Sequence, residues 1–237
     1  MQYKTIFNKD NLDDYLLKLA KEYKRITKSK IHAEIILIGG ASIIINYGFR
    51  DMTNDIDAII NASVAMKEAI NNVGDEFGLE NGWLNDDFKI TSSYSPKIIQ
   101  YSTFYKTFDH IIDVRTIKKE YLIAMKLKSF RQYKSDISDI IGIILTEKKQ
   151  GNDISLNKIR NALIDLYGEN FKLSKEADSF INNLTEKNDL VELFNFYKEN
   201  ENLIEDKLTK LGDKDKAKIN EKNIDDVITF LKNKDNN

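Results

Sequence analysis

Residues 35–60 read IILIGGASIIINYGFRDMTNDIDAII, and this stretch decides the fold. The apolar run 35–38 ends at Gly39 and Gly40, after which a second apolar run begins at Ala41. The pattern predicts a buried strand, a tight turn and the start of a short buried helix. Because glycines carry no Cβ and the first N–H groups of a helix lack backbone partners, this turn is suited to holding phosphate oxygens.

Two acidic residues follow at the end of the same stretch. Asp55 and Asp57 flank Ile56 in a second predicted strand, and the two-residue period of a strand places both carboxylates on one face. Neighbouring carboxylates repel unless solvent or a cation separates them, and hard divalent cations prefer oxygen ligands. We therefore expect Asp55 and Asp57 to bind Mg²⁺ or Mn²⁺. A phosphate cradle beside such a site indicates phosphoryl or nucleotidyl transfer.

These residues resemble a known motif. The apolar strand, Gly39-Gly40, the short helix and Asp55-x-Asp57 are similar to the motif of the nucleotidyltransferase superfamily related to DNA polymerase beta. More narrowly, the sequence from Arg50 through Thr53 to Asp57 resembles the Arg-x-Ser/Thr-x-Asp-x-Asp pattern of the AbiEii-like group, many of whose members are toxins of toxin-antitoxin pairs. The resemblance implies NMP transfer from an NTP. Its nucleotide-binding residues would be Gly39, Gly40, Ser42, Arg50 and Thr53.

A second segment carries the same resemblance. The AbiEii-like pattern places Leu-x-Ala-x-Lys on a helix, then an Arg, then Lys/Arg-Asp-x-x-Asp. The matching residues are Leu122, Ala124, Lys126, Arg131, Lys134, Asp136 and Asp139. The resemblance implies that Lys126 contacts phosphate and that Asp136 completes the site. From the residues alone, Lys126 lies among apolar neighbours, so an aliphatic stem reaching toward solvent is the alternative interpretation.

The sequence offers two candidates for a third carboxylate in the site. In enzymes resembling DNA polymerase beta, the strand beside Asp-x-Asp contributes another acid. Asp113 and Asp109 are both candidates, because the segment around them predicts paired strands over residues 98–108 and 110–117. A turn or strand-edge aspartate without a catalytic role is the alternative for each. The sequence does not choose between the two, and Asp113 is included among the expected catalytic residues.

Composition narrows the class of protein. The chain has 237 residues and a formal net charge of −2, with 36 basic and 38 acidic residues, so an RNA contact requires a local basic patch. Residues 116–134 supply one, with six basic residues against Glu120. The chain has no cysteine, begins without a signal-peptide pattern and has no membrane-length apolar run, so we expect a cytoplasmic protein.

The remaining pattern is mainly helical. We expect helices over residues 11–27 and 63–73 around the core, and a helical region after the Gly151 turn. The expected later helices are 155–167, 174–184, 189–211 and 223–232. The predicted fold is α/β (α+β), a small mixed sheet covered by helices in domain 1–150, followed by a helical domain over 151–237.

The expected function is metal-dependent transfer of NMP from an NTP. For the acceptor, the resemblance favours a tRNA 3′ end, with the protein acting as a toxin that has a cognate antitoxin partner. Proteins and small molecules are alternative acceptors. A different class of function is a non-catalytic module of the same fold that binds a partner protein.

Overall fold

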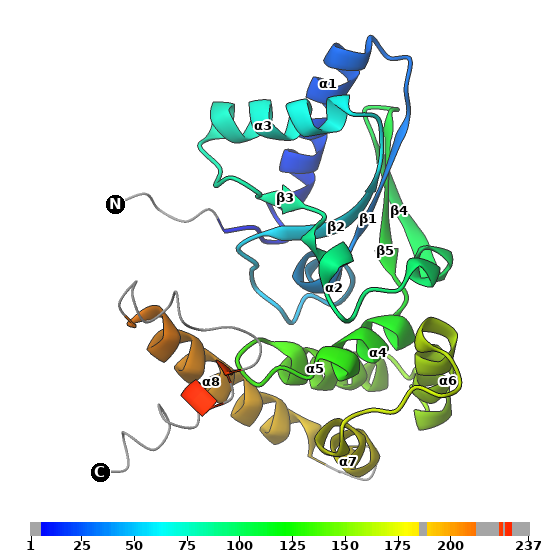
Figure 1. Cartoon of the computed structure of the whole chain (residues 1–237), viewed down its shortest axis with the longest axis vertical. Helices are drawn as coiled ribbons and strands as arrows, with labels where there is room; N and C mark the ends of the chain where they lie inside the picture. The colour runs from blue at the N-terminus through cyan, green and yellow to red at the C-terminus, as the bar shows by residue number, and fades with distance from the viewer. Residues whose placement is uncertain (1–5, 185–188, 212–222, 225, 229–237) are drawn as a thin grey trace.

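The computed structural model of the chain describes residues 6–184, 189–211, 223, 224 and 226–228 (Figure 1). Five strands and eight α-helices are named within these residues, with two 3-10 helices between β3 and β4. The first half contains α1 (Leu12–Thr27), β1 (Ala33–Leu37), α2 (Gly39–Tyr47), β2 (Ile56–Asn61), α3 (Ala65–Phe77), β3 (Leu84–Asn85), the 3-10 helices Asp87–Ile90 and Pro96–Tyr101, β4 (Ser102–Phe108) and β5 (Ile112–Ile117). The second half contains α4 (Lys119–Ser129), α5 (Asp136–Lys149), α6 (Leu156–Tyr167), α7 (Lys175–Leu184) and α8 (Leu190–Thr209).

The strands form one mixed sheet in the order β3-β2-β1-β5-β4. Strand β1 lies at its centre, antiparallel to β2 and parallel to β5, while β4 and β5 form an antiparallel pair. The predicted mixed sheet covered by helices is therefore confirmed. This order matters for function, because β1 leads directly into α2 and its neighbour β2 carries Asp57.

The side chains of β1 alternate between two apolar cores. Ile35 and Leu37 face the core beneath α1 and α3, whereas Ile36 and Ile38 face the core shared with α4 and α5. A strand with helices on both faces needs a continuous apolar run, and 35–38 supplies one. Figure 1 shows α1 and α3 on one side of the sheet and α4 to α8 on the other.

The helices of the second half form one layer. Helix α6 packs on α4, and α8 packs on α5. One apolar core joins sheet residues such as Ile36 and Ile117 to helix residues as far along as Leu190. The predicted boundary at Gly151 follows α5 and so passes through this helical layer. The division into domains 1–150 and 151–237 stays a prediction.

Several local expectations differ from the structure. The predicted strand 98–108 begins as the 3-10 helix Pro96–Tyr101, and only Ser102–Phe108 is extended. Gly39 and Gly40 are the first residues of α2 and do not form a separate turn before it. The expected helix 223–232 lies mostly outside the described residues. Among the described helices, none has the length and apolar character needed to cross a membrane.

Candidate active site

The first turn of α2 forms the floor of the site. Ile38 has extended backbone angles, and Gly39 begins the helix with φ of +55°, a value that glycine tolerates best. A Cβ on Gly39 would lie 3.6 Å from Oδ2 of Asp57, so the Asp57 carboxylate stands against this turn. A Cβ on Gly40 would lie 2.7 Å from Oγ1 of Thr53, so only glycine allows the 50–55 loop to approach this closely.

The two predicted metal ligands lie together beside that turn. Asp57 is half-buried on β2, and Asp55 is exposed just before the strand begins. The N–H of Ile38 donates to the carbonyl oxygen of Asp57 over 2.9 Å, which fixes β2 against the start of α2. Burial and the neighbouring charge of Asp55 raise the pKa of Asp57, while the charges of Arg131 and Lys134 act in the opposite direction. The pair therefore creates concentrated negative charge at a helix N-terminus.

Contacts of Arg50 and of Thr53 hold the loop between α2 and β2 in place. The Arg50 guanidinium contacts Oδ2 of Asp139 at 2.7 Å. Thr53 is buried, and its backbone N–H and carbonyl exchange hydrogen bonds of 2.8 Å with Phe7. Arg50 and Thr53 thus lie beside Gly40, and their observed contacts fix the loop. Their part in nucleotide binding stays a prediction.

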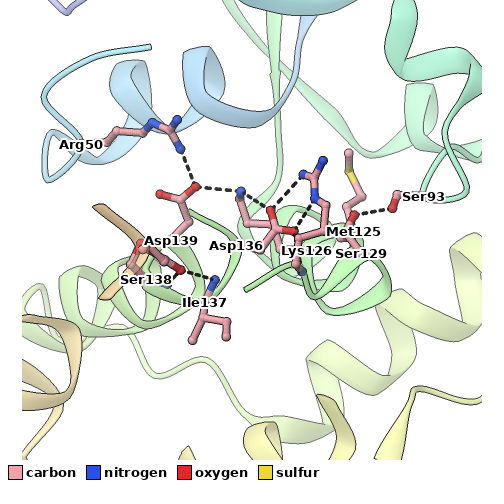
Figure 2. A network of polar contacts seen from close by, with 11 residues as sticks. Arg50, Ser93, Met125, Lys126, Ser129, Asp136, Ile137, Ser138 and Asp139 are labelled. Carbon is pink, nitrogen blue, oxygen red and sulfur yellow. Dashed lines mark hydrogen bonds and ion pairs between the residues drawn. The ribbon is translucent and has the colours of Figure 1, made fainter. Parts of the chain in front are cut away.

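A buried cluster of charges surrounds Lys126 (Figure 2). Nζ of Lys126 lies 2.7 Å from Asp139 and 3.3 Å from Asp136, and the three side chains are 9%, 3% and 2% exposed. Arg131 also holds Asp136, through Nε at 2.9 Å and its backbone N–H at 3.1 Å. Burial disfavours ionised Asp136, but Lys126 and Arg131 outweigh burial and keep the pKa of this carboxyl below its usual value.

This geometry excludes one of the two interpretations of Lys126, a side chain that reaches toward solvent. Its ammonium does not reach outward from an apolar face, because α4 is buried from Leu122 to Leu127 and two carboxylates receive the charge. The resemblance implied a phosphate contact. In the structure, the Lys126 ammonium pairs with Asp136 and Asp139, which in turn bind Arg131 and Arg50.

Ser42 is placed differently from the predicted cradle. The side chain is fully buried, and its Oγ accepts a hydrogen bond from the N–H of Ile117 over 3.3 Å. The hydroxyl therefore joins α2 to the end of β5. Gly39 and Gly40, which are half-buried, remain as the accessible part of the predicted cradle.

Asp113 lies at the other end of the sheet. It pairs in register with Glu34, whereas Asp57 meets β1 at Ile38, four residues further along. At roughly 3.3 Å per residue this separation is about 13 Å along the strand. Asp113 is exposed and accepts a hydrogen bond from Thr107. The structure thus does not bring Asp113 to Asp55 and Asp57, because the strand register places it at the opposite end of the sheet.

The other candidate, Asp109, is also remote. It lies in the turn between β4 and β5 with a positive φ of 46°, and its carboxylate pairs with Lys24 of α1 at 3.1 Å. Within the described residues, no group of three or more acidic, histidine or cysteine side chains is suited to hold a metal ion. A metal at Asp55 and Asp57 would take its other ligands from substrate and water.

Sequence reasoning missed Glu201 on α8. Its Oε1 accepts hydrogen bonds from the N–H groups of Ile137 (3.2 Å) and Ser138 (3.1 Å), so this carboxylate caps the N-terminus of α5. Burial raises its pKa to about 7, although hydrogen bonds from Ser138 oppose the shift. Its other oxygen has no hydrogen-bond partner among the described residues. The available signal was an acid lying between Tyr197 and Ile204 on one helical face.

Comparison with known proteins identifies the family of the chain. A family model described as a nucleotidyltransferase of unknown function (DUF6036) matches residues 14–187. The chain belongs to this family. The match extends from α1 to just beyond α7 and therefore includes both motifs. No curated protein and no solved structure matches the chain.

The protein is thus a nucleotidyltransferase, and this class of enzyme takes an NTP as substrate. The matched region contains α2, β2, α4 and α5 and therefore includes Gly39, Asp57, Lys126 and Asp136. The family assignment agrees with the nucleotidyltransferase superfamily predicted from the sequence.

We predict that Ser42→Ala destabilises this nucleotidyltransferase without impairing catalysis. The change leaves the buried N–H of Ile117 without an acceptor, which costs about 1–3 kcal/mol. Urea denaturation measures the loss, and turnover per folded molecule at saturating NTP should stay at the wild-type value. A variant with unchanged stability and weakened NTP affinity would return Ser42 to the phosphate cradle.

We predict that Asp57→Asn stabilises the metal-free protein at neutral pH. The folded-state pKa of Asp57 lies above its unfolded value of about 3.9, so ionisation of Asp57 opposes folding above that pH. The gain in the free energy of unfolding should shrink as the pH falls and vanish near pH 3. Denaturation in EDTA across this range is the measurement, and a pH-independent gain would contradict the electrostatic cause.

Proposed function

We propose that the protein transfers NMP from an NTP to the hydroxyl at the end of an RNA acceptor, with a divalent cation bound at Asp55 and Asp57. The observation that carries the proposal is the position of these carboxylates against the first turn of α2, where Asp57 lies 3.6 Å from the site of a Gly39 Cβ. Helix N–H groups attract phosphate, whereas carboxylates repel it. Their combination serves a phosphate only when a cation lies between them.

The residues present fit Mg²⁺ or Mn²⁺. Mg²⁺ is commonly bound by one or two carboxylates, with substrate phosphates and water completing its oxygen shell. Asp55 and Asp57 supply the carboxylates. Burial and the charge of Asp55 raise the pKa of Asp57, and a bound cation would relieve the repulsion between the two carboxylates. When bound, the ion would neutralise charge on the triphosphate and on the departing pyrophosphate.

The protein groups then have separate tasks. The N–H groups at Gly39 and Gly40 hold the triphosphate, with its α-phosphorus facing the acceptor. Arg131 and Lys134, whose charges reach Asp57, stabilise negative charge that develops during transfer. The acceptor oxygen bonds to the α-phosphorus, the bond to pyrophosphate breaks, and the hydroxyl proton passes to solvent. Lys126, Asp136 and Asp139 position Arg131 and Arg50 without touching substrate.

An RNA acceptor is supported by the local charge. Although the chain is slightly acidic overall, residues 116–134 carry six basic side chains against Glu120. Of these, Lys118, Arg131 and Lys134 are exposed. The narrower acceptor, a tRNA 3′ end, and a role as a toxin with a cognate antitoxin rest on the AbiEii-like motifs around Asp57 and Asp136.

The test is transfer of label from each α-labelled NTP to total cellular RNA and to a whole-cell lysate, followed by separation of RNA, protein and small molecules. We predict label on RNA that requires Mg²⁺ or Mn²⁺. Asp57→Asn should lower the rate by about three powers of ten, equivalent to roughly 4 kcal/mol of barrier. The matched control Asp113→Asn removes the same charge at the far end of β5 and should leave the rate unchanged.

Two results would contradict the proposal. A wild-type rate for Asp57→Asn would remove these carboxylates from the reaction. Label on protein or on a small molecule in place of RNA would keep the enzyme class and overturn the acceptor. If no acceptor in the lysate is labelled and the NTP binds equally in EDTA and in Mg²⁺, a non-catalytic partner-binding module would be the better account.

A further inference from the structure

A cavity of about 450 Å³ lies between the α4–α5 connection, α7 and α8. Its walls include Phe130, Gln132, Ile137, Phe180, Asn183 and Tyr197. Small-molecule sites in proteins have this size and this mixture of apolar walls with a few polar groups. The cavity lies outside the Gly39 and Asp57 site, and the function proposed above gives it no role.

The cavity adjoins the active-site cluster through the chain itself. Phe130 and Gln132, on its wall, flank Arg131, which holds Asp136 and whose charge reaches Asp57. Figure 2 shows the side chain of Ile137 directed away from Arg50, toward the opposite side of the α5 N-terminus. A ligand that contacts Arg131 can therefore have one part near Asp57 and another part in the cavity.

The cavity walls combine aromatic rings with hydrogen-bonding side chains. The rings of Phe130 and Phe180 lie 5.3 Å apart between centroids, and those of Phe180 and Tyr197 lie 6.0 Å apart. All three are half-buried, so they present apolar surface to the cavity. Gln132 and Asn183 are exposed and place amide groups on the same wall. Flat apolar faces and amide hydrogen bonds are the chemistry by which proteins bind unstacked bases.

The charged side chains at the cavity indicate which part of a nucleotide it would bind. Glu176 also lines the cavity and repels a phosphate there, while Arg131 beside the cavity has a side chain that is 42% exposed. A base inside and a backbone phosphate at Arg131 satisfy both conditions. An NTP held at Gly39 and Asp57 has its own phosphates at the first turn of α2, which does not line the cavity. The acceptor strand is therefore the better occupant.

We propose that this cavity binds one unstacked nucleobase of a single-stranded RNA acceptor, close to the end that is modified. The inference rests on the proposed transfer to RNA and adds the recognition element for the acceptor. Stacking on Phe180, with hydrogen bonds to Gln132 and Asn183, would fix the strand so that its terminal hydroxyl reaches Asp55 and Asp57.

The test measures binding of a short fluorescein-labelled single-stranded RNA to the full-length chain by anisotropy. Phe180→Leu keeps apolar volume and removes the ring, and it should weaken RNA binding about 10-fold, within the range known for base stacking on aromatic side chains. Phe196→Leu is the matched control, because Phe196 is on α8 and 58% exposed but does not line the cavity. It should bind RNA like the wild type.

A series of RNAs with a single abasic position gives a second measurement. Removal of the base at one position near the modified end should weaken RNA binding to the wild type about as much as Phe180→Leu weakens binding of the intact RNA. The two losses of affinity should not add, because both remove the same contact. Gln132→Ala, at an exposed position, should weaken binding of the intact RNA and leave binding of that abasic RNA unchanged. This variant keeps the test valid if Phe180→Leu unfolds.

Three outcomes would overturn the inference. The first is equal RNA affinity for Phe180→Leu and Phe196→Leu, and the second is additive losses of affinity with every abasic RNA. The third is a fall in the NTP affinity of Phe180→Leu, which would put the NTP base in the cavity. The proposed function fails separately. Wild-type protein that binds RNA with this abasic pattern but transfers no label would keep the cavity and reject the transfer.

Discussion

The structure depends on the contact between the Lys126 ammonium and the carboxylates of Asp136 and Asp139. All three side chains are nearly inaccessible to water, at 9% exposure or less. Burying one of these charges alone is costly, whereas together with Arg50 and Arg131 each carboxylate has two cationic partners. The cluster thereby fixes the start of α5 relative to α4 and to the loop that follows α2. These ion pairs join the three elements that carry or adjoin the proposed nucleotide site.

The same junction joins the sheet to the helical layer. Phe49, beside Arg50, packs so closely on α5 that a Cβ on Gly142 would lie 2.5 Å from its ring, and it also meets Phe194 of α8 edge-on at 5.7 Å. Glu201 reaches from α8 to cap α5. The helical region therefore supports the nucleotidyltransferase core directly. It also forms, with Phe130 and Phe180, the cavity that we assign to the acceptor.

Features set by residues that are close together in the sequence could be predicted from it. The apolar run 35–38, the adjacent glycines and the two-residue spacing of Asp55 and Asp57 predicted a strand, a helix start and a paired carboxylate site, and these lie together in the structure. Contacts set by distant elements could not be predicted in this way. Strand register decides that Asp113 faces Glu34, and the position of α2 against β5 turns the Ser42 hydroxyl toward Ile117. Glu201 acquires its role only because α8 folds back on α5.

The most direct test of this account is the free energy of unfolding of Lys126→Met compared with Lys128→Met. Both changes remove a lysine charge from α4, but Lys128 is half-exposed and lies over the rings of Tyr167 and Phe171. Removing one partner of a buried ion pair costs about 3–5 kcal/mol, and an exposed cation–π contact contributes about 0.5–1 kcal/mol. We predict a loss of about 3 kcal/mol or more for Lys126→Met and about 1 kcal/mol or less for Lys128→Met in urea denaturation. Equal losses for the two variants would contradict the claim that the Lys126 cluster holds the site together.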